Sequence, residues 1–425
     1  MRLTDAERAM ADGAQGRAAA RAMDLLIRYG EALGAERLVE VTNVAGTWSV
    51  ANPILRDYAA RGMDAVFSEF NLDSAEVVET PQAAVTACQL IGGLDARRPD
   101  VLGVAPEVVA LNEAGERYFA ARGVAMHATC TPYQVGNVPL FGEHCAWMES
   151  SAVVYANAVL GARTNTEGRE STGAASITRR IPYWGLHIPE NRAATHLVRA
   201  EIPVRGMRDW GLFGYWLGAQ IEDGVCALDG VLERPRPVEL KHFGAAAASS
   251  GGLEMYHIPG VTPEAPDLAA AFRGRAPRET LRFGAAERRA AWEALNGRCT
   301  GDEVDFVMLG CPHNSIEQVQ VVARLLEGRR IRDGVALWVF TPRALGEVAE
   351  RTGLAEVIRA AGGQLLSDTC PAISRIVPKG ARRAATDSAK QAHYLPAITG
   401  VETLFGDVES CVQAALTGRF AEAAP

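Results

Sequence analysis

The chain has 425 residues, of which 43 are basic and 51 acidic, so its formal net charge at pH 7 is -8. Hydrophobic residues make up 48% and charged residues 22% of the sequence, which excludes a largely disordered or fibrous chain. The acidic balance argues against nucleic-acid binding, and no apolar run approaches the roughly 18 residues that a membrane span needs.

Eight cysteines are too few for a disulfide framework in a chain of this length, so we expect free thiols. The first residues are typical of a helix start, with Thr4 as a candidate N-cap, and lack the apolar core of a secretory signal. We therefore expect a cytoplasmic protein. At about 150 residues per compact unit, the length corresponds to roughly three lobes.

The N-terminal part of the chain is predicted to alternate helices with short strands. An Ala-rich stretch over residues 6–33 predicts a helix, and residues 38–41 predict a strand. A second helical pattern covers residues 106–121, with Gly123 in the position of a C-terminal cap. The apolar segment 124–128 is expected to be a strand whose carboxyl end delivers Cys130.

Polar groups are concentrated between residues 142 and 168. The start of this segment places Glu143 and His144 before an apolar helical stretch, and its end brings Arg163 and Asn165 into a turn rich in hydrogen-bond donors. A carboxylate beside a histidine fixes the tautomer and charge of the ring, so these residues are candidates for binding substrate and moving protons. A satisfied polar network at a junction between lobes is the alternative.

The segment 240–252 is rich in small residues, including Ser249 and Ser250, and precedes an expected strand over residues 253–258. Small side chains there would let backbone N–H groups approach an anion closely. All but three of the 43 basic residues are arginine, and the lysines are Lys241, Lys379 and Lys390. A compositional bias of the source genome is the simpler explanation, but the three lysines remain candidates for chemical groups.

The C-terminal third carries the clearest pattern. Residues 305–309 and 335–340 predict buried strands, and the helix between them begins at a capping-box pair, Ser315 and Gln318. A further helix opens at residues 341–342, and residues 364–367 predict a third strand. This alternation of strands and helices predicts an α/β fold with a parallel sheet.

Cysteines follow two of these strands. Cys311 comes directly after the first strand, and Cys370 comes after the third. Because the carboxyl ends of parallel strands meet at one edge of a sheet, we expect both thiols at that edge. If Cys130 ends a strand of a neighbouring lobe that faces this edge, three thiols converge. The alternative is that each cysteine is a small buried hydrophobe.

Other ionisable residues flank the same strands. His313 is a candidate acid beside a metal or only a donor at a helix start, and Lys390 follows the candidate N-cap Ser388 at helical spacing, where a solvated helix face is the alternative. The sequence lacks CxxC pairs and the P-loop, dinucleotide-binding, zinc-protease and serine-hydrolase motifs. The other cysteines are expected to be packing residues: Cys88, Cys145, Cys226, Cys299 and Cys411.

Nine ordered blocks extend this set of candidates into a pattern that covers nearly the whole chain, from about residue 1 to 420. They are residues 129–133, 136–139, 141–144, 149–152, 161–165, 240–244, 310–313, 368–370 and 388–394. Together they resemble the large, catalytic portion of aconitase X. Nine blocks in one order are far more specific than any single motif.

The resemblance implies a three-lobed α/β aconitase-type core of parallel and mixed sheets flanked by helices, with lobes over about 1–125, 126–290 and 291–425. It also implies an iron or iron-sulfur centre held by Cys130, Cys311 and Cys370. In aconitases the base is a serine on a swivelling small domain. This chain is too short to contain that domain, so we expect it on a separate small subunit of roughly 130 to 150 residues.

Roles follow for the candidate residues named above. We expect Glu143, His144, His313 and Lys390 to act in catalysis, with Lys390 also a candidate for holding the substrate carboxylate. The residues expected to bind substrate are Arg163, Asn165, Ser249, Ser250 and Ser388. Three positions depart from the family pattern, and they put the substrate in doubt more than the fold: Met148, Asn314 and Asp387.

The resemblance further implies a hydro-lyase that removes water from a small hydroxy acid. We expect cis-3-hydroxy-L-proline as the substrate, with phosphomevalonate or another hydroxy acid as the alternative. Two other hypotheses about the function stay open: a metal-free thiol enzyme with a cysteine nucleophile, and a non-catalytic subunit that requires a small partner.

Overall fold

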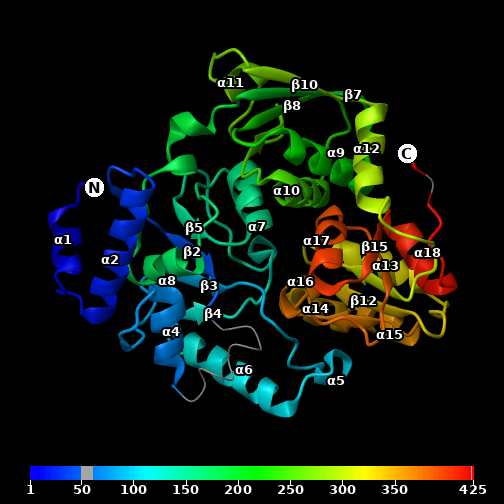
Figure 1. Ribbon diagram of the computed structural model, residues 1–425, viewed down its shortest axis with the longest axis horizontal. Coiled ribbons are helices and arrows are strands. Elements are labelled where there is room, and N and C mark those ends of the chain that lie inside the picture. Colours follow the sequence, from blue (N-terminus) through cyan, green and yellow to red (C-terminus); the bar gives the residue numbers. More distant parts are fainter. Residues whose placement is uncertain (49–60, 423) are drawn as a thin grey trace.

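The computed structural model describes residues 1–48, 61–422 and 424–425. Three α/β lobes surround the middle of the molecule: the N-terminal part of the chain lies to the left in Figure 1, the central part at the top and the C-terminal part to the right. Each lobe is built on its own parallel sheet. No helix among the described residues is long and apolar enough to cross a membrane.

The first lobe is built on a four-stranded parallel sheet in the order β4-β3-β2-β5. Its strands are β2 (Asn43–Gly46), β3 (Thr86–Gln89), β4 (Val124–Ala125) and β5 (Cys145–Trp147). A two-stranded antiparallel sheet pairs β1 (Leu38–Glu40) with β6 (Arg180–Pro182). Its helices are α1 (Asp5–Ala11), α2 (Arg17–Ala32), α4 (Met63–Leu72), α5 (Pro99–Leu102), α6 (Pro106–Ala120) and α8 (Arg169–Thr178).

The second lobe has a four-stranded parallel sheet in the order β10-β7-β8-β9. Its strands are β7 (His196–Val204), β8 (Cys226–Leu232), β9 (Tyr256–His257) and β10 (Glu279–Phe283). Its helices are α9 (Gly206–Gln220), α10 (Pro237–Gly251), α11 (Leu268–Phe272) and α12 (Ala285–Asn296). α7 (Ser150–Tyr155), which continues as a π-helix over Ala156–Leu160, packs against α10. Short 3-10 turns cover Pro132–Gln134, Gly185–His187 and Pro189–Arg192.

The third lobe confirms the predicted parallel sheet, which has five strands in the order β13-β12-β11-β14-β15. The strands are β11 (Phe306–Leu309), β12 (Ala336–Phe340), β13 (Gln364–Leu366), β14 (Arg383–Thr386) and β15 (Glu402–Phe405). The helices are α13 (Ile316–Leu326), α14 (Arg343–Arg351), α15 (Leu354–Ala360), α16 (Pro371–Ser374), α17 (Ala389–Thr399) and α18 (Val408–Thr417). Ser315 and Gln318 form the expected capping box.

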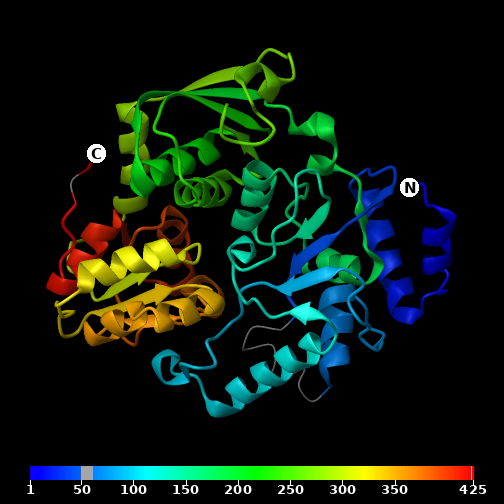
Figure 2. The same ribbon diagram turned by 180° about the vertical axis from the view of Figure 1, so that it is seen from behind.

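Both faces of this sheet are buried, and the side chains of successive residues of β11 point to opposite faces. Val307 and Leu309 pack with α13, α15 and α18, whereas Phe306 and Met308 pack with α17 and with first-lobe residues next to α5 and α6. Figure 2 shows the helices of this lobe on both sides of its strands. Through this second face, the third lobe therefore packs against the first lobe, close to Cys130.

Four expectations differ from the structure. The predicted helix over residues 6–33 is two helices, because Gly13 and Gly16 take φ values of 91° and 93° between them. The predicted strand over residues 124–128 keeps two residues, and that over 253–258 keeps Tyr256 and His257. The sheet of the first lobe also takes in residues 145–147, so it extends past residue 125.

Glu167, directly before α8, gives a stability prediction. Burial raises the pKa of this carboxyl to about 7, although the Ser171 hydroxyl donates a hydrogen bond of 2.7 Å to it. A raised pKa means that the stability Glu167 contributes is present below about pH 4.5 and is lost as the pH rises through 7. We expect Glu167→Gln to be more stable than the parent at pH 8, by up to about 3 kcal/mol, and similar to it at pH 4.5.

Urea unfolding at the two pH values measures this difference. Glu170→Gln, at an exposed position in the first turn of α8, is the matched control and should change neither midpoint by much. An equal gain for Glu167→Gln at both pH values would contradict the explanation, because removal of a titrating carboxyl must act more strongly at the higher pH.

Candidate active site

Three cysteine thiols from two lobes share one buried cluster. Cys130 follows β4 of the first lobe, Cys311 follows the central strand β11, and Cys370 is the N-cap of α16. Their exposed fractions are 8%, 6% and 7%, and they pack together with apolar side chains of the lobe boundary. Burial raises the pKa of Cys370 well above its usual value, and a negative charge on Cys311 or Cys130 raises it further.

The chemistry of this donor set fits an iron centre. Burial raises the pKa of Cys130 to about 12 and that of Cys311 to about 11, so these thiols keep their protons unless a cation replaces them. Each sulfur also has a donor next to it: the His313 N–H lies 3.3 Å from Cys130 Sγ, Ser388 faces Cys311, and backbone amides of α16 face Cys370. Such donors stabilise thiolate ligands of iron.

The three thiol groups do not converge on a single point in the structure. Within residues 1–48, 61–422 and 424–425, no three His, Cys, Asp or Glu side chains lie close enough together to hold one metal ion as they stand. Cys130, Cys311 and Cys370 remain the candidate ligands of an iron centre because they share one buried cluster, and the structure specifies no nuclearity for it.

A buried ion pair lies beside the thiols. Lys390 Nζ is 2.5 Å from Glu149 Oε1 and 3.4 Å from Ser151 Oγ, and the lysine and glutamate side chains are 13% and 17% exposed. Burial opposes the charge on Lys390, but Glu149 and the nearby Cys311 raise its pKa above the usual value. In turn Lys390 holds the pKa of Glu149 low despite its burial. Lys390 is therefore a fixed cation next to the thiols, on a half-buried rather than solvated helix face.

His313 connects the three segments that carry the thiols. Its Nε2 lies 3.1 Å from the Thr369 carbonyl oxygen, so Nε2 carries the proton and Nδ1 accepts from the Thr129 hydroxyl at 2.8 Å. Thr129 precedes Cys130 and Thr369 precedes Cys370. Burial lowers the pKa of His313 to about 4. With both ring nitrogens engaged, the neutral imidazole positions the thiol segments.

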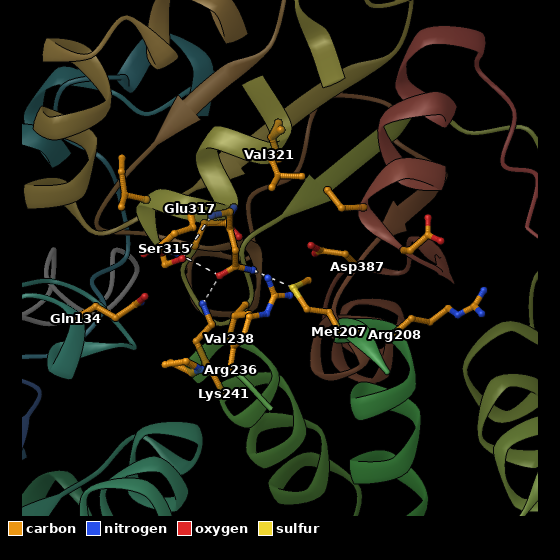
Figure 3. A pocket seen from close by; sticks show the side chains of 18 of the residues that line it. Gln134, Met207, Arg208, Arg236, Val238, Lys241, Ser315, Glu317, Val321 and Asp387 are labelled. Atoms are coloured by element: carbon orange, nitrogen blue, oxygen red, sulfur yellow. Dashed lines mark hydrogen bonds between the residues drawn. The ribbon is translucent and has the colours of Figure 1, made fainter. Parts of the chain in front are cut away.

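Lys241 is a site residue that the expected set did not include. Its side chain is 3% exposed, and Nζ donates to the His313 carbonyl oxygen at 2.8 Å and to Gln318 Oε1 at 2.5 Å. Burial lowers its pKa to about 8. Figure 3 shows the lysine reaching from α10 towards the first turn of α13. The scarcity of lysine in the sequence was the signal that could have selected it.

Lys241 also lines a cleft of about 990 Å³ between the second and third lobes. The first turns of α9, α10, α13 and α18 form its walls. Asp387, next to Ser388, lines the cleft as well; burial raises its pKa to about 7, while the Lys241 charge opposes this rise. Its Oδ1 has no hydrogen-bond partner in the part of the chain that the structure describes. Ser388 caps α17 by accepting from the Gln391 N–H at 3.1 Å.

Unlike Glu149, the candidate residues Glu143, His144 and Asn165 make their hydrogen bonds away from the thiol segments. Glu143 Oε2 accepts from the Leu140 N–H at 2.6 Å, and the Asn165 amide binds backbone groups of residues 184 and 186. His144 Nδ1 lies 3.0 Å from His187 Nδ1, and burial together with Arg163 lowers the pKa of His144 to about 4. These contacts form a polar network, but it lies within the first lobe and not at a junction between lobes as the alternative supposed, and the substrate-binding role of these residues stays a prediction.

Ser249 and Ser250 lie in the last turn of α10 rather than in an irregular segment. Their hydroxyls donate to carbonyl oxygens of the preceding turn, at 2.7 Å for Ser249 and 3.2 Å for Ser250. Small residues let α9 and α10 approach closely, because a Cβ on Gly214 or Gly218 of α9 would collide with the α10 backbone and a Cβ on Gly251 of α10 would collide with Gly218. These two serines therefore face the helix pair, and neither hydroxyl is bonded to Lys390 or to a thiol.

Comparison with known protein families identifies the family to which this chain belongs. The models of the first, second and third domains of aconitase X match residues 1–190, 194–293 and 304–417. The chain belongs to the aconitase X family. The expected three-domain α/β fold is confirmed by the crystal structure of aconitase X from Thermococcus kodakaraensis in its holo-form, with a TM-score of 0.81, 31% identity and coverage of 98% of this chain and 100% of that one.

Two kinds of dehydratase are among the relatives of this chain. The chain is 36% identical over 408 residues to the phosphomevalonate dehydratase large subunit of Methanothermobacter thermautotrophicus, covering 94% of this chain and 95% of that protein. It is also 36% identical over 427 residues to the cis-3-hydroxy-L-proline dehydratase of Pseudomonas aeruginosa, covering 98% of this chain and 70% of that protein. The expected reaction class, a dehydratase and hence a carbon–oxygen lyase, is confirmed.

Proposed function

We propose that the chain is the large subunit of an iron-dependent dehydratase that eliminates water from a small hydroxy acid. The observation that supports this proposal is that Cys130, Cys311 and Cys370 share one buried cluster beside the Lys390–Glu149 pair. An iron centre bound by these cysteines supplies a Lewis acid for the departing hydroxide.

The protein's own groups bind and orient the substrate. Lys390 has three N–H donors, of which Glu149 and Ser151 engage two, so one donor is available for a substrate carboxylate. The ion pair with Glu149 keeps Lys390 protonated for this role. His313 holds the thiol segments in register, and Lys241 fixes the His313 carbonyl from the second lobe.

We infer that cis-3-hydroxy-L-proline is the substrate. Its ring nitrogen is a cation, and Asp387 on the cleft wall offers a buried acceptor atom, Oδ1, that has no hydrogen-bond partner among the described residues. A carboxylate in that position favours a substrate with an ammonium group over one with a doubly charged phosphate. Phosphomevalonate is the second candidate, because this chain matches those large subunits over 95% of the length of the Methanothermobacter protein.

A small partner subunit belongs to the same proposal. Several relatives are called large subunits, whereas the longer Pseudomonas relative is matched over 70% of its length. We infer that a small subunit of roughly 130 to 150 residues supplies the swivelling domain and the base, at an interface between polypeptides where such sites commonly form.

Reconstitution tests the proposal directly. The chain is combined without oxygen with iron, sulfide and the proposed small subunit, and dehydration of cis-3-hydroxy-L-proline and phosphomevalonate is measured side by side. We expect turnover of the hydroxyproline only when both subunits and iron are present. Undiminished turnover without iron would refute the iron-dependent mechanism, and failure with every hydroxy acid would favour a non-catalytic subunit.

A further inference from the structure

A buried ion-pair network lies at the boundary of the first and third lobes, directly before Cys370. Arg343, the first residue of α14, donates from Nε to Asp368 Oδ2 at 2.6 Å and from Nη2 to Asp95 Oδ1 at 3.0 Å. Asp95 comes from the first lobe and is 3% exposed, and Asp368 comes from the third lobe and is 6% exposed. One guanidinium therefore joins carboxylates from both lobes.

Backbone hydrogen bonds extend the network to the chain on each side of the boundary. Asp95 Oδ2 accepts from the Ser367 N–H at 2.9 Å, and the Gly92 N–H donates to the Asp368 carbonyl oxygen at 2.8 Å. Asp368 itself has a φ of 62°, a conformation that a non-glycine residue adopts at a cost. The contacts to Arg343 and to the first lobe hold it there.

This location matters because the thiols come from different lobes. Cys130 belongs to the first lobe, whereas Cys370 follows Asp368 by two residues in the third lobe. We propose that Arg343, with Asp95 and Asp368, is a positioning residue that sets where the Cys370 thiol lies relative to Cys130. The inference rests on the proposed iron site, but the placement of the thiol can be measured without iron.

The same boundary offers a matched control. Arg97 pairs with Glu347, so this ion pair also joins the loop after Asp95 to α14. Its side chains are 64% and 52% exposed, and it makes no hydrogen bond to residues 367–370. Loss of this pair removes an interaction across the same boundary but leaves the support of Cys370 in place.

The test compares Arg343→Gln, Arg343→Lys and Arg97→Gln in the full chain. In the iron-free protein, the alkylation rates of Cys370 and Cys311 by iodoacetamide are followed by peptide mass spectrometry. We expect Arg343→Gln to speed alkylation of Cys370 about tenfold over the parent while that of Cys311 changes less, because the segment opens more readily. Arg97→Gln should match the parent, and Arg343→Lys, which keeps the charge, should lie between.

Iron binding gives a second readout. After reconstitution, we expect Arg343→Gln to bind iron about 10- to 100-fold more weakly, as for other residues that orient metal ligands. If Arg343→Gln does not fold, Asp95→Asn carries the same two measurements. A folded variant with parental Cys370 protection and parental iron affinity would overturn the inference. If the parent itself binds no iron, the proposed function fails, while the alkylation rates still decide the role of Arg343.

Discussion

The Cys311→Ser variant is expected to be purified without iron and to lose at least about 100-fold in turnover, because changes that only orient metal ligands already cost 10- to 100-fold. Cys311 lies at the end of the central strand β11 and shares a buried cluster with Cys130 and Cys370. A serine hydroxyl stays protonated at neutral pH and is a poor substitute for a thiolate. Iron content and the thiolate-to-iron absorption band, measured without oxygen, report the loss.

Cys299→Ser is the control for this variant. Cys299 is in the third lobe too, but it is half-buried and its thiol donates to the Thr403 carbonyl oxygen at 3.2 Å, a bond that a serine can also make. We expect it to keep both iron and turnover. If Cys311→Ser kept both, the assignment of the thiols would be wrong. Complete inactivation by a single alkylation with no effect of chelators would instead favour a metal-free thiol enzyme.

The third lobe could be predicted from the sequence because its signals are local. Buried strands such as β11 read as short apolar runs, and the Ser315–Gln318 capping box marks the start of α13 within four residues. Once the strands are predicted to be parallel, their carboxyl ends must lie at the same edge of the sheet. The neighbourhood of Cys311 and Cys370 follows from this rule, since one strand, β12, lies between their strands.

The role of segment 240–252 could not be predicted because it depends on a distant partner. Small residues permit either an anion-binding loop or close packing of two helices, and the local composition is the same in both cases. Gly214 and Gly218 of α9 show that the segment packs closely against a helix, because the α10 backbone lies where a Cβ on either glycine would be. Ser249 and Ser250 therefore complete a helix end.

The ion pairs of the site depend on contacts across the lobes. Lys390 and Glu149 are 241 positions apart, so their pairing appears only when the first and third lobes meet. Lys241 similarly reaches a carbonyl of a turn 72 positions away. Charge at such residues can be read from the sequence, but the partner that makes a buried charge stable cannot.

Replacing Lys390 with methionine is expected to destabilise the chain by about 3 kcal/mol or more and to abolish turnover. The substitution leaves Glu149 buried without its cation, and an uncompensated buried charge is far more costly than a lost contact. With Lys390 absent, the desolvation that the lysine now offsets would raise the pKa of Glu149. Urea unfolding of the variant and the parent at pH 7 gives the difference in stability, and the reconstituted enzyme gives the turnover.

A double-variant cycle separates the two effects. Glu149→Gln combined with Lys390→Met should recover much of the stability that Lys390→Met loses, because no buried charge remains, but it should recover no turnover, because the donor for the substrate carboxylate is still missing. Arg289 and Glu293 form an exposed helical pair at 3.0 Å, and breaking it should cost less than about 1 kcal/mol. Turnover restored in the double variant would show that Lys390 serves only the fold and that another group binds the carboxylate.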